Sequence, residues 1–207
     1  MGKIIYFLLF TLLVPSALFA MEAKITKFRG GVTLSNQPVR VGMKVREGST
    51  LHARGERSFV IVEFSNGSKM MVRDGKLKVK LYKNTSPIME LVRGKVFTSV
   101  VHEEDKSFFI RTKSSTMGVR GTEFYISEET KSYLCVCDGS VIVENQNGRK
   151  EVSRGEEVYA TKKSSLDIQS ATKKNWMLAV KEFKRMGITV SPRKKKVDPT
   201  PSPTAKP

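Results

Sequence analysis

The sequence has few of the residues from which metal and catalytic sites are built: two cysteines and two histidines among 207 residues. Structural zinc sites need four closely spaced ligands, mostly cysteine and histidine, and no such cluster occurs. No histidine lies near a serine or cysteine that could act as a nucleophile, and no glycine-rich loop opens a predicted helix. We therefore expect a protein that is not an enzyme and that needs no cofactor and no metal.

Acidic residues are also scarce, because 37 lysines and arginines face 20 aspartates and glutamates, for a net charge of +17. A charge of this size implies attraction to nucleic acid, acidic lipid headgroups or acidic polymers. Overall composition is ordinary for a folded domain, at 39% hydrophobic residues, so a hydrophobic core is expected.

The N-terminus decides among these partners. Lys3 gives a basic start, residues 4–14 form an apolar run, and residues 15–20 end in small residues. This layout predicts a secretory signal peptide over residues 1–20, with cleavage after Ala20. An uncleaved anchor over residues 4–20 is the alternative. We expect a periplasmic or otherwise exported protein, which removes nucleic acid from its natural partners.

The two cysteines, Cys135 and Cys137, occur two residues apart within a predicted strand. Such residues share a face, and their Cβ atoms lie roughly 7 Å apart, beyond the ~4 Å of a disulfide. We expect two unbridged, buried cysteines rather than a metal or redox site.

Residues 25–163 consist of short apolar runs separated by glycine, asparagine and aspartate turns, without helical periodicity. Residues 58–64 are apolar on both faces, which predicts the most buried strand. Asn66-Gly67 predicts a hairpin. Gly-x-Val segments recur at residues 30–32, 94–96 and 139–141. The recurrence predicts an all-β domain, rolled or β-helix-like.

The most distinctive segment is residues 115–126, where Gly118 and Gly121 bracket Val119-Arg120. Glycines at this spacing predict a tight corner between strands. The alternation after Gly121 predicts a half-buried strand. The segment closely resembles the signature of the FecR-like periplasmic domain family. The signature residues are Gly118, Val119, Arg120, Gly121, Thr122, Glu123 and Phe124.

The resemblance implies an all-β, non-enzymatic interaction domain. We interpret the signature as a structural element and as a possible interaction corner. Arg120 has two interpretations: it braces Glu123 or a local carbonyl group, or it receives an anionic ligand together with exposed backbone N–H groups.

Residues 170–187 have helical periodicity, with an apolar arc and a basic outer face. The arc includes Trp176, Ala179, Val180, Phe183 and Met186. This arc either packs on the β domain or binds a membrane surface or a partner. Residues 191–207 are rich in proline and lysine and are expected to be disordered. The possible contacts to anionic surfaces are Lys173, Lys174, Lys181, Lys184, Arg185, Arg193, Lys194, Lys195 and Lys196.

In the best-known members of the family, the domain is the periplasmic part of a membrane-anchored sigma-factor regulator. Here the apolar run begins at residue 4, so we do not expect this chain itself to hold a cytoplasmic sigma factor. The sequence predicts a protein-interaction or signal-sensing module of the cell envelope, which binds another envelope protein. The alternative is a protein that binds lipopolysaccharide, peptidoglycan or anionic lipid through its basic C-terminus, with peripheral membrane contact. The oligomeric state stays open.

Overall fold

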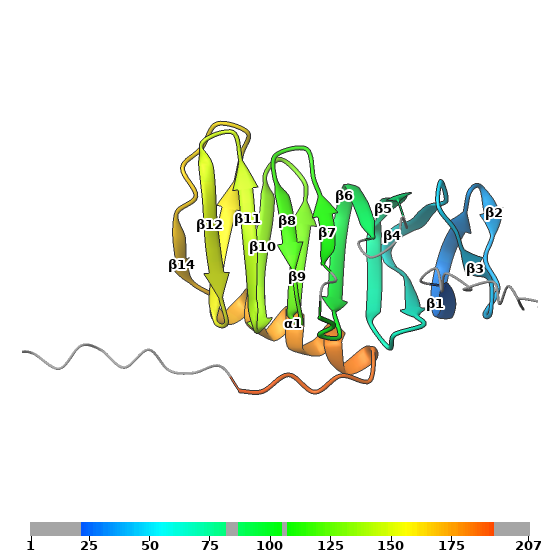
Figure 1. The fold of residues 1–207 in the computed structure, drawn as a ribbon. Helices are drawn as coiled ribbons and strands as arrows, with labels where there is room; N and C mark the ends of the chain where they lie inside the picture. The colour runs from blue at the N-terminus through cyan, green and yellow to red at the C-terminus, as the bar shows by residue number, and fades with distance from the viewer. Residues whose placement is uncertain (1–21, 82–86, 105–106, 193–207) are drawn as a thin grey trace, which may run out of the picture.

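The computed structural model describes residues 22–81, 87–104 and 107–192, which form fourteen β-strands and one α-helix (Figure 1). The first seven strands are β1 (Ala23–Leu34), β2 (Gln37–Pro38), β3 (Lys44–Val45), β4 (Thr50–Phe64), β5 (Lys69–Leu81), β6 (Ile88–Ser99) and β7 (Phe108–Arg111). The remaining elements are β8 (Thr116–Val119), β9 (Glu123–Glu128), β10 (Ser132–Asp138), β11 (Ser140–Asn145), β12 (Gly148–Ser153), β13 (Glu156–Ala160), β14 (Ile168–Ser170) and α1 (Lys173–Arg185).

The long strands bend sharply at residues with a positive φ. β5 bends at Asp74 (φ 41°) and β6 at Gly94 (φ 94°). A Cβ atom on Gly94 would lie 2.2 Å from the carbonyl oxygen of Asp74, so no side chain fits between these neighbouring corners. The corner also shifts the alternation of side chains, so that both halves of a strand face the same core. In β5 the inward residues are Met70, Val72, Leu77 and Val79.

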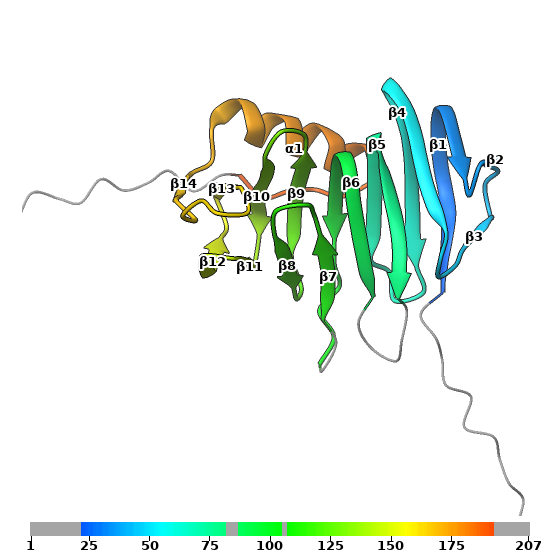
Figure 2. The ribbon, with the colours of Figure 1, turned by 90° about the horizontal axis from the view of Figure 1, so that it is seen from above.

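These bends fold one continuous sheet into two layers (Figure 2). The covered layer contains residues 23–29, 59–64, 69–73 and 94–99 of the four long strands, with β3, β9, β10, β13 and β14. The open layer contains residues 31–34, 50–54, 75–81 and 88–93 of the same strands, with β2, β7, β8, β11 and β12. The predicted rolled, all-β fold is confirmed.

The chain crosses between the layers at two opposite edges. β9 pairs its last residue, Glu128, with Gly94 and its first residue, Glu123, with Ser99. The bend of β6 at Gly94 and the bend before β9 at Gly121 therefore lie at opposite ends of β9. The bends at Gly30, Gly55, Asp74 and Gly94 lie at one edge, and the crossings at Gly121, Gly139 and Gly155 lie at the other.

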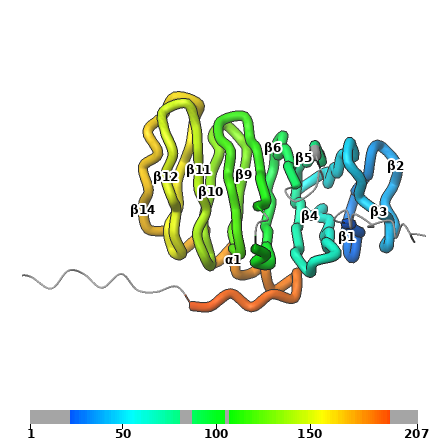
Figure 3. The backbone as a smooth tube through the Cα atoms, viewed as in Figure 1, coloured from blue at the N-terminus to red at the C-terminus, as the bar shows by residue number. Residues whose placement is uncertain are grey.

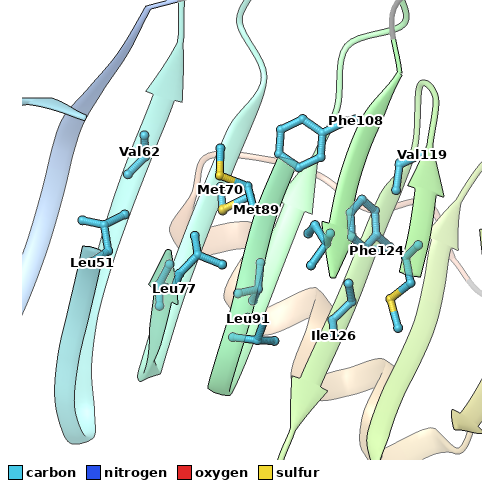
Figure 4. Close-up of a cluster of buried hydrophobic side chains, with 14 of the residues drawn as sticks. Leu51, Val62, Met70, Leu77, Met89, Leu91, Phe108, Val119, Phe124 and Ile126 are labelled. Atoms are coloured by element: carbon cyan, nitrogen blue, oxygen red, sulfur yellow. The ribbon is translucent and has the colours of Figure 1, made fainter. Parts of the chain in front are cut away.

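The core lies between the two layers and is almost entirely aliphatic and aromatic (Figure 4). Leu51 and Leu77 of the open layer face Val62 and Met70 of the covered layer, and each is at most 2% exposed. Burial of this kind stabilises by roughly 1.5–3 kcal/mol per large side chain. A single core therefore holds both layers together.

The helix α1 packs across the outer face of the covered layer, as one of the two interpretations of its sequence expected (Figure 1). Phe183 is fully buried and meets the ring of Phe97 edge-on, with 6.2 Å between the centroids. Phe97 in turn stacks on Tyr125 at 4.6 Å. After α1 the chain turns back along the helix (Figure 3), and Ile188 and Val190 pack on the same cluster.

Two buried carboxylates fix the helix to the sheet. Glu157 of β13 accepts hydrogen bonds from the Tyr133 hydroxyl (2.6 Å), the Thr172 backbone N–H (3.1 Å) and the Asn175 side chain (3.1 Å) at the helix N-terminus. Burial alone would raise the pKa of Glu157, but these hydrogen bonds outweigh it and the pKa is lowered. Glu182, on the helix itself, forms an ion pair with Arg73 of β5.

The turns follow the sequence in most places. The hairpin predicted at Asn66-Gly67 connects β4 to β5. A second hairpin connects β11 to β12, where Asn145 pairs with Gly148. Gly139 lies at a layer crossing, because β10 and β11 belong to different layers and do not pair. The outward side of β9 differs from the expected half-buried strand, since α1 covers it and leaves Tyr125 only 3% exposed.

Candidate interaction surface

The signature joins β8 of the open layer to β9 of the covered layer. Gly121 has φ +60°, and a Cβ atom there would lie 2.8 Å from the Cβ of His102. This position therefore needs glycine both for its backbone conformation and for space. The structure places the predicted corner at Gly121 alone.

Gly118 is not part of the corner, contrary to the expectation from its spacing. It lies within β8 directly opposite Phe109 of β7, and a Cβ atom there would lie 3.3 Å from the Phe109 ring. The aromatic side chain covers the glycine across the strand pair, so Gly118 makes room for the ring on the open face.

Thr122 ties two corners together. Its hydroxyl lies 2.8 Å from the Ser140 carbonyl oxygen and 3.0 Å from that of Arg120, and it donates to these acceptors. A Cβ atom on Gly139 would lie 2.8 Å from the Gly121 carbonyl oxygen. The crossings at Gly121 and Gly139 are thus packed against each other, which gives the signature its structural role.

A groove of about 560 Å³ runs along the open face beside the signature. Half-buried Phe109 and Ile142 form its apolar floor, and Arg120 stands at one side. Charged residues of both signs, Glu144, Arg149 and Glu151, also line the groove. A groove with an apolar floor and a charged rim has the composition of a protein-binding surface.

Arg120 is exposed and does not brace Glu123. Its side chain forms no hydrogen bond or ion pair with any residue that the structure describes. Glu123 is half-buried, and its pKa is raised by burial and then by the charge of Asp138. The structure therefore does not support the bracing interpretation among the residues that it describes.

The predicted cationic residues of the helix fall into two groups. Lys173, Lys174, Lys181 and Lys184 are exposed. Arg185 is half-buried, lies 3.4 Å from Glu182 and is centred 6.0 Å above the Phe59 ring, so it is a packing residue. Arg193, Lys194, Lys195 and Lys196 lie outside the described residues, as do residues 1–20 and most of the predicted tail.

Neither Cys135 nor Cys137 forms a disulfide, and both are fully buried on the helix-covered side of β10, which agrees with the unbridged pair expected from their spacing. The pKa of the Cys137 thiol is raised by its hydrogen bond with Cys135 and by burial. The Cys137 thiol is therefore kept in its unreactive protonated form.

Within residues 22–81, 87–104 and 107–192, no group of three or more His, Cys, Asp and Glu side chains is placed to hold a metal ion. The same part of the chain contains no helix of the length and hydropathy needed to cross a bilayer.

Sequence reasoning did not identify Phe109 and Ile142 as surface residues. Each stands between two core residues in an uninterrupted apolar run, Phe108-Phe109-Ile110 and Val141-Ile142-Val143. An alternating strand with one solvent face should carry a polar residue at that position. This break in the alternation is the sequence feature that could have identified Phe109 and Ile142 as surface residues.

A comparison with known protein families finds a match in the middle of the chain. Residues 50–142 match the model of the family described as FecR protein. The matched segment runs from the start of β4 into β11 and contains the whole signature. The resemblance inferred from the signature is therefore confirmed. None of the curated proteins matches the chain.

Two solved structures from Parabacteroides distasonis, both provisionally described as anti-sigma factors, are similar to this one. The first is 15% identical, with a TM-score of 0.53 over 60% of this chain and 61% of its own. The second is 16% identical, with a TM-score of 0.42 over 70% of this chain and 62% of its own. This chain thus covers less than two thirds of either, and the first of them supports the fold alone.

Proposed function

We propose that this chain, whose residues 50–142 form a FecR-type segment, is a non-enzymatic signal-sensing module that binds another protein of the cell envelope in the periplasm. The observation that carries the proposal is the groove beside the signature. Phe109 and Ile142 expose apolar surface there, and Arg120 is left without a partner among the described residues. Such a surface, on a rigid two-layer scaffold, suits a protein ligand.

Photo-crosslinking in the native host tests the proposal. Ile142→p-benzoylphenylalanine places the crosslinker on the groove floor, and the same replacement at Lys181 places it on the exposed face of the helix. We expect an adduct with one envelope protein from position 142 and not from position 181. A second variant, Arg120→Glu, should abolish that adduct. Adducts of equal yield from both positions would contradict the proposal.

Localisation is tested separately. Intact mass of the protein recovered from the periplasmic fraction should correspond to a chain beginning at Met21. A full-length mass in the membrane fraction would instead support the anchor interpretation of residues 4–20.

A second candidate function is supported by Lys173, Lys174, Lys181 and Lys184, which are exposed along one element. In this alternative the basic C-terminus binds lipopolysaccharide, peptidoglycan or anionic lipid. Binding led by lysine and arginine should weaken steeply with salt, whereas an interface centred on Phe109 and Ile142 should not.

A further inference from the structure

A group of basic side chains lies on the open face in the N-terminal half of the sheet, far along the chain from the signature. The strand register places His52 of β4 beside Lys76 of β5, and Lys76 beside Arg93 of β6. Arg54 follows His52 by two residues and shares its face. Three adjacent strands therefore bring four basic side chains together.

His52 lies between two guanidinium groups. Arg54 Nε donates to His52 Nδ1 at 3.3 Å, and Arg93 Nη2 lies 3.4 Å from His52 Nε2. A neutral imidazole has one acceptor nitrogen and one N–H group, so it can accept from only one of these arginines. The other guanidinium group therefore has N–H donors beside the His52 ring for which the ring offers no acceptor.

No carboxylate among the residues that the structure describes balances the charge of the cluster. Among the described residues, none forms an ion pair with Arg54, Lys76 or Arg93. The neighbour of His52 on β1 is Thr33, which carries no charge. Burial first, and then the charges of Arg54, Arg93 and Lys76, lower the pKa of His52. Three positive charges therefore repel one another here at neutral pH.

We propose that Arg54, Lys76 and Arg93, together with His52, form a binding site for a phosphate group. Guanidinium forks match the oxygens of a tetrahedral oxyanion, and a dianion relieves the repulsion that the free cluster carries. Bound phosphate would also favour the imidazolium form of His52, which then donates to the anion. The phosphate can be a free ion or part of a phosphorylated headgroup. The site is separate from the groove and does not depend on the proposed function.

Side-chain NMR of the two histidines of the full chain tests the site. Inorganic phosphate is titrated at pH 7 against sodium chloride of equal ionic strength. We expect a saturable shift of the His52 resonances and a rise of its pKa, with His102 as the internal control. Arg54→Gln and Arg93→Gln should each weaken phosphate binding about tenfold. Lys150→Gln, which removes an exposed charge on β12, should leave it unchanged.

Vesicles distinguish the two sources of phosphate. Phosphatidylcholine vesicles with and without about one fifth phosphatidylglycerol are sedimented with the wild type and the two arginine variants. Loss of sedimentation in these variants assigns the site to a headgroup, and phosphate binding without it assigns the site to a soluble phosphate. If His52 shifts no more than His102, or if both arginine variants bind phosphate like the wild type, the proposal is overturned. The crosslink at position 142 is unaffected by either result.

Discussion

The two outer faces of this folded sheet are made by the same bent strands, yet their chemistry is opposite. On the covered layer, β5 and β6 present Met71 and Phe97, which are fully buried beneath α1. On the open layer, the same strands present Lys78 and Glu90, which remain partly exposed. A single strand therefore changes from an apolar to a charged outer side as it passes its corner.

This difference separates stability from binding. The covered face has a fixed occupant, since α1 belongs to the same chain and is held by Glu157 and Glu182. The open face has none among the described residues, and it carries both the groove and the basic cluster. Substitutions on the covered face should therefore change folding, and substitutions on the open face should change binding. Four experiments test this distinction.

The largest effect is expected from Phe183→Ala. The ring is fully buried between α1 and Phe97, so its removal should destabilise the protein by about 3–5 kcal/mol. Met177→Ala, on the same helix but 60% exposed, is the matched control and should change stability by less than about 0.5 kcal/mol. Urea denaturation measures both. Equal effects would mean that α1 does not cover the sheet in solution.

Gly121→Val should cost about 1–3 kcal/mol, because valine is strained at φ +60° and its Cβ would press on His102. Gly48→Val separates the two causes, since Gly48 has φ +77° with nothing within 4 Å of its would-be Cβ. The Gly121 variant should melt below the Gly48 variant. Identical melting temperatures would show that the signature corner is not crowded.

Glu157→Gln should remove a pH dependence. The pKa of Glu157 is lowered by folding from its usual 4.5, so its stabilisation is present above that pH and is lost as the pH falls through the folded-state pKa. At pH 7 the variant should be less stable by about 1–3 kcal/mol. The difference from wild type should shrink in acid below about pH 4.5. Glu151→Gln on the open face is the control, and a similar profile for it would contradict the assignment.

The smallest effect is expected from Ile142→Ala. Its side chain is half-buried on the open face, so the loss should stay below about 1 kcal/mol. Ile61→Ala removes the same atoms from beneath α1, where Ile61 is 4% exposed, and should cost about 2–5 kcal/mol. If the two isoleucine variants unfold at the same urea concentration, the open face is less open than the structure describes.

The sequence was sufficient for the class of the fold because its turn chemistry is local. Asn66-Gly67 and the apolar run at residues 58–64 specify a hairpin and a buried strand without reference to the rest of the chain. The recurring glycines also predicted bends. The edge at which each bend lies depends on strand pairing, as with Gly94 and Gly121 on either end of β9, and no local signal carries that information.

The candidate sites were predicted less well, because they too depend on strand pairing and packing that have no local signal in the sequence. The signature identified Arg120, but its freedom from Glu123 depends on side-chain packing. The basic cluster brings together His52, Lys76 and Arg93 from three strands, and their register is invisible in the sequence. Phe109 and Ile142 broke the alternation of their strands, yet the same break also occurs beneath α1, where it marks burial.

The position of α1 at the end of the described fold has a consequence for the nascent protein. A polypeptide is made from its N-terminus, so every strand of the covered layer precedes the helix that shields it. Until the chain has been made as far as residue 186, the aromatic cluster of Phe59, Phe97, Tyr125 and Tyr133 is not covered by α1. Such a surface attracts other incomplete chains. Quality control would therefore meet this protein with an exposed aromatic surface until α1 has been made, and a premature stop codon after β13 would preserve that state.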